Sequence, residues 1–222
     1  MEGFFSSVPD TDLMQAVFAE LNKHYSLLEI SLNPMNLVPF IGNRQERINQ
    51  RLLLNSPLES IDENIHKTHR KNIRRAEKAG IQVNTISSQQ FLNFKLENKG
   101  DYPEDTAVLM ELVKILEKQK SIYCLGAYQN EQLVTAILLV HFQNSYTLIS
   151  SETTPTGKQQ KAMFSLIYHV ISEKANTDFI FDFEGSSIPG IYEFNNGFGA
   201  KDEIYYSINI NNLPWYLKWM KR

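Results

Sequence analysis

The sequence predicts an α+β protein with an α/β/α layered arrangement, in which a mixed but mostly antiparallel sheet is flanked by helices. Three strand-like runs follow one another between residues 121 and 151, and only the tight turns Asn130-Glu131 and Asn144-Ser145 separate them. Helix and strand patterns then alternate over residues 158–210. An antiparallel meander followed by such alternation is typical of a sheet covered by helices.

Length and composition indicate a soluble globular protein. The chain has 222 residues, enough for one large domain or for one domain and a fragment of another. Its 42% hydrophobic and 21% charged residues argue against disorder, and a net charge of −3 leaves only a local patch for binding nucleic acid. The single cysteine, Cys124, excludes an intramolecular disulfide and is interpreted as a packing residue in an apolar run.

The sequence indicates no metal site, membrane span or export signal. The five histidines lack the spacing of metal ligands. The longest aliphatic run, Ala136 to Val140, is too short to cross a bilayer as a helix, and no basic-then-apolar segment opens the chain. We therefore expect a cytoplasmic protein that holds no metal.

The first half of the chain is predicted to contain helices and two strands. A helix at Asp10–His24 and a turn-rich connector at residues 33–43 precede the first predicted strand, Ile48–Leu54. Because they have no core of their own, residues 1–43 are interpreted as the remnant of an upstream domain, and residues 44–222 as the main domain. The apolar face of the first helix is predicted to consist of Leu13, Val17, Phe18 and Leu21.

A capping box, Ser60-Ile-Asp-Glu63, predicts the start of a helix that runs to Ala79 and stops at Gly80. The remaining predicted elements are a strand at Ile81–Ile86, helices at Gln89–Asn98, Glu104–Gln119, Lys158–Ala175 and Ile188–Asn196, and strands at Asp178–Phe183 and Glu203–Ile210. The helix at Lys158–Ala175 is expected to face inward with Met163, Leu166, Ile167, Val170 and Ile171. The aromatic and basic residues 213–222 predict a helix that docks on a sheet edge, with a membrane surface as the alternative.

Two acids mark the end of the strand at residues 178–183. Asp182 and Glu184 alternate with phenylalanines, so both are expected on one face of the strand, and the chain breaks directly after them. Groups just past the carboxyl end of a strand face the crevice where ligands bind in an open α/β sheet. Either a carboxylate whose pKa is raised by partial burial accepts a proton there, or both acids pair with a basic side chain or cap backbone N–H groups.

A basic segment lies on the helix that follows the capping box. Its cations are Lys67, Arg70, Lys71, Arg74, Arg75 and Lys78. Four of them recur at three- and four-residue spacings and therefore share a helix face. This face is either a solvated surface or a binding site for a phosphorylated ligand, a tRNA acceptor stem or another polyanion, because guanidinium groups match phosphate and carboxylate geometry.

Three segments, together with the order of the elements, resemble the GNAT acyltransferase fold in its FemAB-like branch. The basic helix His69–Ile81 is similar to that branch's "rrnirka…g" segment, Phe181–Gly185 to its "DFxG" strand end, and Phe194–Gly199 to its "FkxgFG" segment. The resemblance covers about residues 44 to 210. Proteins of this type usually pair two such domains, which implies that the chain is the second domain with the end of the first.

The resemblance implies an acyl- or aminoacyltransferase whose donor is acyl-CoA or aminoacyl-tRNA and whose acceptor is a small-molecule or peptide amine. GNAT enzymes hold the coenzyme A pyrophosphate on a glycine-rich loop, which corresponds here to Gly157, Lys158, Gln159 and Gln160. Only one glycine of that loop is present, a departure that is compatible with the aminoacyl-tRNA branch. An ordinary helix cap is the alternative interpretation of this segment.

The resemblance also bears on the general acid. GNAT enzymes often use a tyrosine four residues before a Gly-Phe pair, a position that Glu193 occupies here, with Tyr192 one place away. The hypothesis is an acyltransferase with Asp182, Glu184, Tyr192 and Glu193 as its catalytic candidates. The rival hypothesis is a catalytically silent GNAT-like module that binds an anionic partner.

Overall fold

The computed structural model describes residues 11–34, 42–98, 106–185 and 188–217. The chain forms two compact units, which are described separately: unit 1 comprises Met1–Asn49 and Asp202–Arg222, and unit 2 comprises Gln50–Lys201. No helix within the described ranges is both long and apolar enough to span a membrane.

The strands form a mixed sheet in the order β1-β8-β2-β7-β6-β5-β4-β3. The pairs β1–β8, β2–β7, β3–β4, β4–β5 and β5–β6 are antiparallel and β6–β7 is parallel, as the sequence predicts for a mostly antiparallel sheet. The strands are β1 (Leu27–Ser31), β2 (Asn43–Leu53), β3 (Gln82–Ile86), β4 (Ile122–Gln129), β5 (Gln132–Phe142), β6 (Ser145–Thr153), β7 (Ile180–Asp182) and β8 (Lys201–Asn211).

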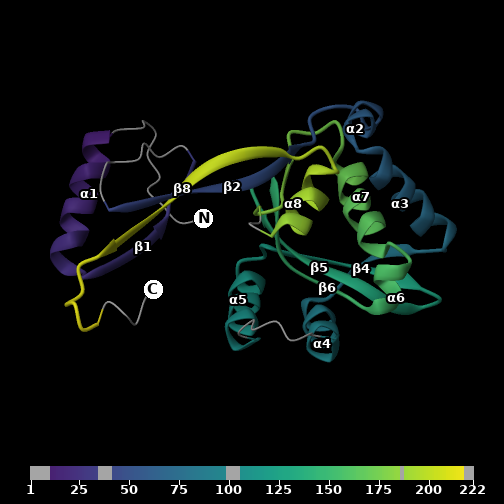
Figure 1. Ribbon diagram of the computed structural model, residues 1–222. Helices are drawn as coiled ribbons and strands as arrows, with labels where there is room; N and C mark the ends of the chain where they lie inside the picture. Colours follow the sequence, from purple (N-terminus) through teal and green to yellow (C-terminus); the bar gives the residue numbers. More distant parts are fainter. Residues whose placement is uncertain (1–10, 35–41, 99–105, 186–187, 218–222) are drawn as a thin grey trace. The chain divides into compact units, whose positions relative to one another are not determined.

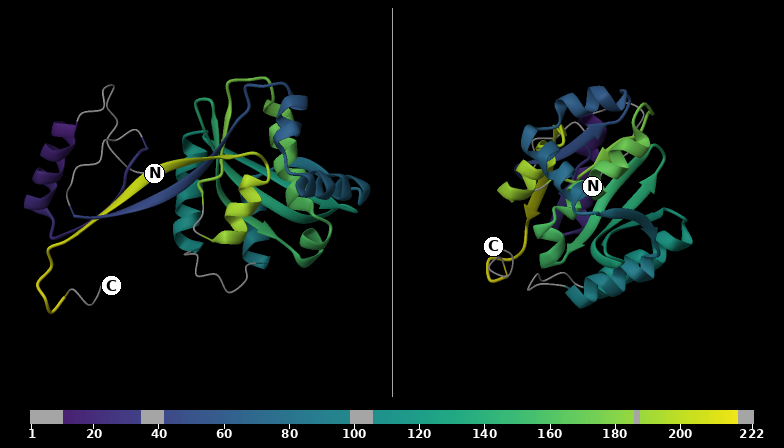
Figure 2. Two further views of the ribbon diagram at one scale, coloured as in Figure 1. Left: turned by 45° about the horizontal axis from the view of Figure 1, so that its top comes forward. Right: turned by 90° about the vertical axis from the view of Figure 1, so that its right-hand side faces the viewer.

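Helices cover both faces of the sheet in unit 2 (Figures 1 and 2). The helices of the described chain are α1 (Thr11–His24), α2 (Leu58–Asn64), α3 (Lys67–Lys78), α4 (Ser88–Asn98), α5 (Thr106–Lys118), α6 (Pro155–Gln159), α7 (Ala162–Lys174) and α8 (Pro189–Asn196). The fold class is therefore confirmed, with α4 and α5 on one face of the sheet and α3, α7 and α8 on the other (Figure 1).

Each face of the sheet in unit 2 has its own apolar core. On one face α7 buries Leu166, Ile167, Val170 and Ile171 completely, the inward face that the sequence predicts. On the other face Val113 and Leu116 of α5 pack with Phe91 of α4. Cys124 belongs to this second core, and burial raises the pKa of its thiol to about 12, which confirms a packing residue rather than a reactive one.

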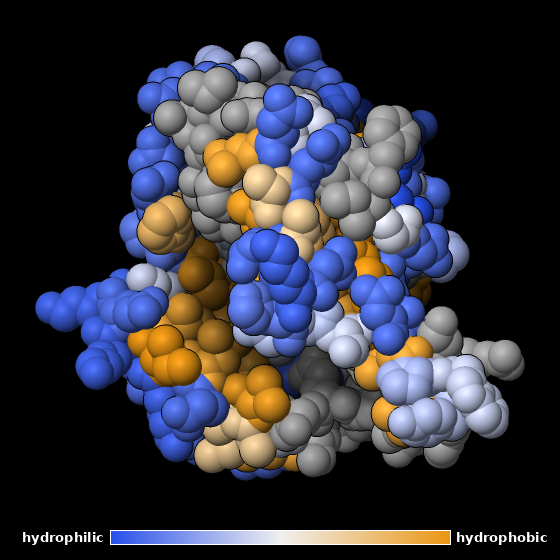
Figure 3. Space-filling model, turned by 90° about the vertical axis from the view of Figure 1, so that its left-hand side faces the viewer, coloured by the Kyte–Doolittle hydropathy of each residue, from blue (hydrophilic) through white to orange (hydrophobic). Residues whose placement is uncertain are grey.

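Unit 1 has a smaller core of its own. Met14 and Phe18 of α1 pack with Leu28 of β1 and Ile208 of β8. The predicted helix face is wrong at Leu13, which is 38% exposed, because Met14 takes its place in the core. Apolar side chains remain at the surface on the side of the molecule shown in Figure 3. The strand β1 has no counterpart among the sequence predictions, because its run of residues 27–31 is short and contains Glu29.

The helix predicted from Ser60 to Ala79 is two helices. The backbone is extended at Ile65 and His66, and α3 begins only after them. Ile65 is 1% exposed and the N–H of His66 donates to Gly197 O at 2.9 Å, so tertiary contacts break the helix there. The capping-box prediction is wrong because Ser60 lies inside α2, whereas Gly80, with φ of +73°, ends α3 as expected.

The helix predicted at residues 158–175 is also interrupted. Its first two residues belong to α6, which begins earlier at Pro155, and Lys161 with φ of +61° separates α6 from α7. At the other end of the chain, residues 212–217 contain turns and no helix, and Trp215 is 84% exposed. The predicted docking helix is therefore not seen in its described part, and residues 218–222 lie outside the described chain. The other predicted helices and strands are confirmed, although β2 begins at Asn43, before the predicted start at Ile48. Residue 10 of the first predicted helix, residues 35–41 of the connector and residues 104–105 of the helix at Glu104–Gln119 lie outside the described chain.

Candidate functional site

The strands β6 and β7 diverge after a short parallel contact. They pair only over residues 145–147 of β6 and 180–182 of β7, whereas β6 continues to Thr153. Residues 148–153 are therefore paired with β5 on one side and leave an open edge on the other within the described chain. An open strand edge of this kind offers backbone N–H and C=O groups to an extended ligand.

The hydrogen-bond pattern identifies which backbone groups reach the open edge. In an antiparallel pair, residues that exchange hydrogen bonds alternate along the strand. Thr154 N–H donates to Val134 O at 3.0 Å, so the backbone groups of Thr154 point toward β5. Because the direction alternates along the strand, the N–H and C=O groups of Thr153 and Ser151 point away from β5. Ser151 is also exposed to solvent. Its N–H is consequently available at the open edge of β6.

A charged pair from α4 and β6 lies at the same edge. Lys95, which is only 9% exposed, donates from Nζ to Ser151 O at 3.2 Å, and its Nζ lies 4.0 Å from Glu152 Oε2. Glu152 Oε1 accepts a hydrogen bond from Thr153 N–H at 3.0 Å. The sequence analysis missed both residues. The available signal was a lysine four residues after Phe91, on the buried face of α4.

Asp182 ends β7, and its carboxylate accepts hydrogen bonds from the surrounding chain. Its carboxylate, in a residue that is 5% exposed, accepts from Arg51 Nε at 2.8 Å and from Glu184 N–H at 2.8 Å. Arg51 is its register partner on β2. Since Phe181 and Phe183 pack in the core under α7, the alternation of the strand places Asp182 on the opposite face, the one covered by α4 and α5.

Glu184 has a different environment from Asp182. The strand ends at Asp182, and Glu184 has φ of +59°, so the predicted alternation does not extend to it. The residue is exposed, although desolvation by nearby protein atoms raises the pKa of its carboxyl and the Asp182 carboxylate raises it further. Glu184 therefore combines an accessible position with a carboxyl whose pKa is raised.

The helix α8 is fixed by β2. Gln50, which is completely buried, donates to Tyr192 O at 3.3 Å and accepts from Asn195 Nδ2 at 3.0 Å. These bonds leave Tyr192 half-buried and Glu193 exposed. Gln50 O also accepts from Phe183 N–H at 2.9 Å, so α8 and the end of β7 contact the same residue of β2.

The helix α3 also fixes α8. His69 Nε2–H donates to Phe194 O at 2.9 Å, and the imidazole packs edge-on against Phe164 and Phe198 with ring centroids 4.9 and 4.8 Å apart. Burial lowers the pKa of His69, and its hydrogen bond to Phe194 opposes that shift. A neutral imidazole is therefore the form that suits this aromatic environment.

All six cations of α3 line one open groove of about 660 Å³. The spacing along the helix predicts a shared face for Lys67, Lys71, Arg74 and Lys78, and the structure places Arg70 and Arg75 in the same groove. Arg70 is half-buried and donates to Asp62 O at 3.1 Å, while the other five side chains are exposed. Within the described chain, no carboxylate oxygen lies within 4.0 Å of any of these six cations. The groove is therefore a concentrated positive surface.

The segment that corresponds to the GNAT pyrophosphate loop is capped by its own chain. Thr154 Oγ1 accepts from Gly157 N–H at 3.1 Å, and the N–H groups of Lys158 and Gln160 donate to backbone carbonyls. A Cβ on Gly157 would lie 2.3 Å from Val134 O, so the glycine allows α6 to approach β5 closely. Lys158 and Gln159 are exposed. The local hydrogen bonds already use most N–H groups that a pyrophosphate would need.

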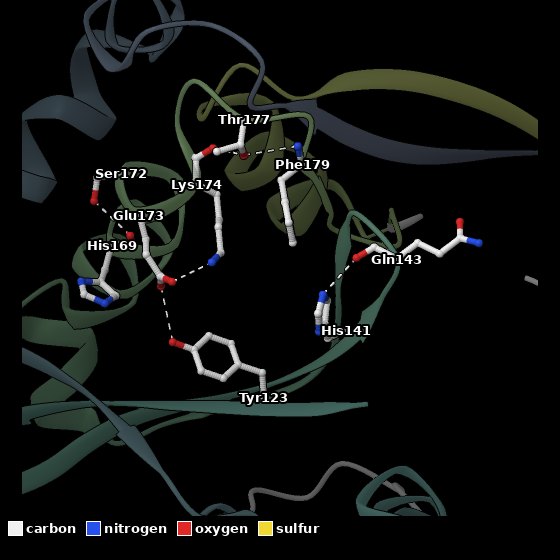
Figure 4. Close-up of polar contacts among 9 residues, drawn as sticks. All are labelled: Tyr123, His141, Gln143, His169, Ser172, Glu173, Lys174, Thr177 and Phe179. Atoms are coloured by element: carbon white, nitrogen blue, oxygen red, sulfur yellow. Dashed lines mark hydrogen bonds and ion pairs between the residues drawn. The ribbon is translucent and has the colours of Figure 1, made fainter. Parts of the chain in front are cut away.

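A second polar cluster lies where β6 and β7 begin, at the other end of these strands (Figure 4). Glu173 pairs with Lys174 at 2.8 Å and accepts from Tyr123 O–H at 3.4 Å. The Lys174 ammonium lies 5.2 Å from the centroid of the Phe179 ring, and its bond to Glu173 raises its pKa. A charged, paired lysine is a poor nucleophile, so we assign no catalytic role to this cluster. Its contact between Tyr123 of β4 and Glu173 of α7 joins the helix to the sheet.

The sequence matches no protein-family model and no curated protein. The fold matches FemX with a TM-score of 0.65 and 9% identity, over 96% of this chain and 79% of FemX. The protein has a GNAT-like fold of the FemAB-like type.

Two further solved structures share this FemAB-like fold. L-PGS from Bacillus licheniformis matches with a TM-score of 0.55 and 12% identity, over 94% of this chain and 75% of its own. The C-terminal domain (DUF2156) of a putative lysylphosphatidylglycerol synthetase from Agrobacterium fabrum matches with a TM-score of 0.52 and 13% identity, over 89% of this chain and 72% of its own. At these identities the likeness concerns the fold.

Proposed function

We propose that the protein is a FemAB-like acyl- or aminoacyltransferase that moves an acyl group from an activated donor to an amine. The observation that carries the proposal is the open edge of β6 at residues 148–153, next to the end of β7. There Ser151 N–H is available to an extended donor. Carboxyl groups for proton transfer lie on the neighbouring strand end.

In this proposal the α3 groove binds the phosphates of the donor. Its cations extend over residues 67–78, which corresponds to about 16 Å at roughly 1.5 Å per helical residue. Such a length exceeds a single pyrophosphate and suits several phosphates of a nucleic-acid backbone. Because Thr154 already caps Gly157, we favour aminoacyl-tRNA over acyl-CoA as the donor.

The transfer needs one proton acceptor and one proton donor. The amine nitrogen attacks the acyl carbon, the bond to the tRNA hydroxyl or coenzyme A sulfur breaks, and the leaving atom gains a proton. We assign proton removal to Glu184, because Arg51 already pairs with Asp182, which then positions Glu184 through its N–H. Tyr192 or Glu193 would return the proton. A hydrogen bond from Ser151 N–H would polarise the acyl carbonyl.

We also propose a cytoplasmic location, because both kinds of donor are found there. In addition, we propose that residues 1–43 form part of an adjoining domain. The amine acceptor would be a small molecule or a peptide.

One arrangement favours the second candidate, a catalytically silent module that binds an anionic partner. Lys95 and Glu152 already contact Ser151 O and Thr153 N–H, two of the backbone groups that a donor would use. The α3 groove would then be the functional surface by itself, with no reaction at β6.

The two candidates differ in their response to donors. Thermal unfolding is followed with acetyl-CoA and, separately, with aminoacyl-tRNA; deacylated tRNA serves as the control for binding to the phosphates alone. A donor at about 100 times its Kd should stabilise the protein by about 2.7 kcal/mol. Stabilisation by neither donor at saturation would reject the transferase for these donors. Equal stabilisation by charged and deacylated tRNA would favour the binding module.

A further inference from the structure

A second hollow of about 570 Å³ lies on the α4 side of unit 2, and its chemistry is opposite to that of the α3 groove. It is lined by α4, by the ends of β4 and β5 with the turn between them, and by the start of α6. We call it the α4 pocket. The residues that its chemistry depends on are Phe94, Glu97, Tyr128, Glu131, Gln132 and Thr156. Its volume falls within the range of small-molecule sites.

The α4 pocket is acidic. Glu97 comes from α4 and Glu131 from the β4–β5 turn, so two different walls each supply a carboxylate. Both residues are exposed, and in the described chain neither carboxylate lies within 4.0 Å of a basic nitrogen. No lysine, arginine or histidine is among the described lining residues. Charge complementarity therefore favours a cationic ligand and opposes a phosphorylated one.

The rest of the lining combines an apolar floor with polar groups. Phe94 is 6% exposed and supplies an aromatic surface, with Leu133 beside it. Within the described segments, the Tyr128 hydroxyl and the Gln132 amide have no hydrogen-bond partner, so both are available to a ligand. An apolar floor with a few convergent polar groups is typical of a site for a small ligand that carries hydroxyl or amide groups.

The α4 pocket adjoins the open edge of β6. Thr154 and Val134 line the pocket and are hydrogen-bonded to each other, and Thr153, directly before Thr154, has its N–H at the open edge. A ligand in the pocket would therefore lie next to the end of β6 at which the proposed donor is placed.

We propose that the α4 pocket binds a primary amine with a polar body, and that this amine is the acceptor of the transfer. Glu97 and Glu131 attract the ammonium group by their charge, and Tyr128 and Gln132 bond to the polar body. The amine would lose its proton to Glu184 only after it leaves the two carboxylates for the donor. The binding site itself follows from the cavity and its charges, whereas the acceptor role rests on the proposed function. The α3 groove and the α4 pocket would then separate an anionic donor from a cationic acceptor by charge.

The test uses two amines with matched neutral forms: lysinamide against Nα,Nε-diacetyl-lysinamide, and glucosamine against N-acetylglucosamine. Binding to the full chain is measured by calorimetry and by NMR shifts of the backbone amides of Glu131, Gln132 and Thr156. We expect at least one amine to bind and shift these signals, with its acetylated form at least ten-fold weaker. No binding by either amine, or equal binding of the acetylated forms, would overturn the proposal.

The carboxylates are tested by the double variant Glu97→Gln and Glu131→Gln, with Glu111→Gln on the exposed side of α5 as the control. Because the substituted residues are exposed and the changes are isosteric, the melting temperature should stay the same. We expect the double variant to bind the amine at least ten-fold more weakly and the control to bind it normally. Unchanged binding by the double variant would contradict the assignment of the two carboxylates.

These measurements need no donor, so they fail or succeed independently of the proposed function. Amine binding at the pocket without acyl transfer would support the site and count against the transferase. Acyl transfer to an amine that leaves the pocket signals unshifted would support the transferase and overturn the acceptor role of the pocket.

Discussion

His69 and Gly197 meet where α3 begins and α8 ends. A Cβ on Gly197 would lie 2.0 Å from His69 Cε1, a distance that no side chain can tolerate. The imidazole cannot move away easily, because it donates to Phe194 O and packs against Phe164 and Phe198. The glycine is therefore required by close packing between two helices, and its neighbourhood determines where α8 lies.

Gly197→Ala should destabilise the protein by about 1 to 3 kcal/mol, because the new methyl group overpacks this contact. Gly190→Ala in the same helix is the matched control, since a Cβ there meets no atom within 4 Å. The control should be neutral or stabilising by up to about 1 kcal/mol, the usual helix preference of alanine over glycine. Urea unfolding measures both. Equal stability of the two variants would contradict the close contact.

The buried imidazole of His69 predicts a loss of stability at mildly acidic pH. Burial lowers its pKa in the folded protein from the ordinary value of 6.5, so the unfolded chain binds more protons between the folded pKa and 6.5. The contribution of His69 to the free energy of unfolding is complete above pH 6.5 and decreases as the pH falls through this window.

His69→Gln removes this titration and should flatten the decrease in stability between about pH 7.5 and 5. Urea unfolding at a series of pH values measures the effect. A wild-type profile in His69→Gln would show that another group is responsible.

Among the elements, β6 carries the most specific test of the proposed site. Ser151→Pro removes the N–H at the open edge, whereas the ladder to β5 does not use that N–H. The affinity of Ser151→Pro for the donor should fall about five- to ten-fold, because the variant loses one hydrogen bond that contributes about 1 kcal/mol to binding. Ser151→Ala keeps the N–H and should bind normally. Equal affinities of the two variants would exclude the Ser151 N–H from donor binding.

The helix α3 predicts an electrostatic response that depends on salt. Reversing the exposed Lys71, Arg74 and Arg75 to glutamate should abolish binding of an RNA hairpin with a tRNA acceptor stem. For the wild-type protein, the logarithm of the affinity should fall linearly with the logarithm of the salt concentration, with a slope of about 0.7 to 0.9 per neutralised phosphate. Reversal of Lys114, Lys118 and Lys120 gives the same change in net charge outside the groove and should have little effect. Similar losses in both triple variants would indicate attraction by net charge alone.

The sequence was informative where local patterns decide the structure. The apolar periodicity of residues 162–171 predicted the buried face of α7, and the turns around the meander predicted β4, β5 and β6. The break between α2 and α3 was not predictable from its own residues, because it depends on the contact of His66 with Gly197, 131 positions away. Helix signals at Ser60 and Glu63 were therefore overridden by tertiary packing.

The candidate site was predictable only in part. The sequence located Asp182, Glu184 and the basic helix, but not the Arg51 that neutralises Asp182 or the Lys95–Glu152 pair. Those contacts join residues far apart in the chain, and the register of β2 with β7 and the packing of α4 on β6 create them. The roles assigned to the site residues remain predictions, and the division at residue 43 does as well.

For the molecule as a whole, unit 2 combines an open strand edge, a cationic groove and an acidic pocket in one FemAB-like domain. A two-substrate transferase needs an activated acyl group and a nucleophile side by side, with their charges kept apart. In the proposed reaction the open edge would hold the acyl group, the groove the phosphates of the donor and the pocket the amine.

Acyl transfer itself tests this account most directly. The protein is incubated with excess lysinamide and with acetyl-CoA or aminoacyl-tRNA that carries a labelled acyl group, and mass spectrometry follows the labelled amide. We predict that one donor yields the amide faster than in the absence of protein, that Ser151→Ala retains this activity and that Ser151→Pro loses most of it. Product formation at the protein-free rate with both donors, or equal rates in the two Ser151 variants, would contradict the account.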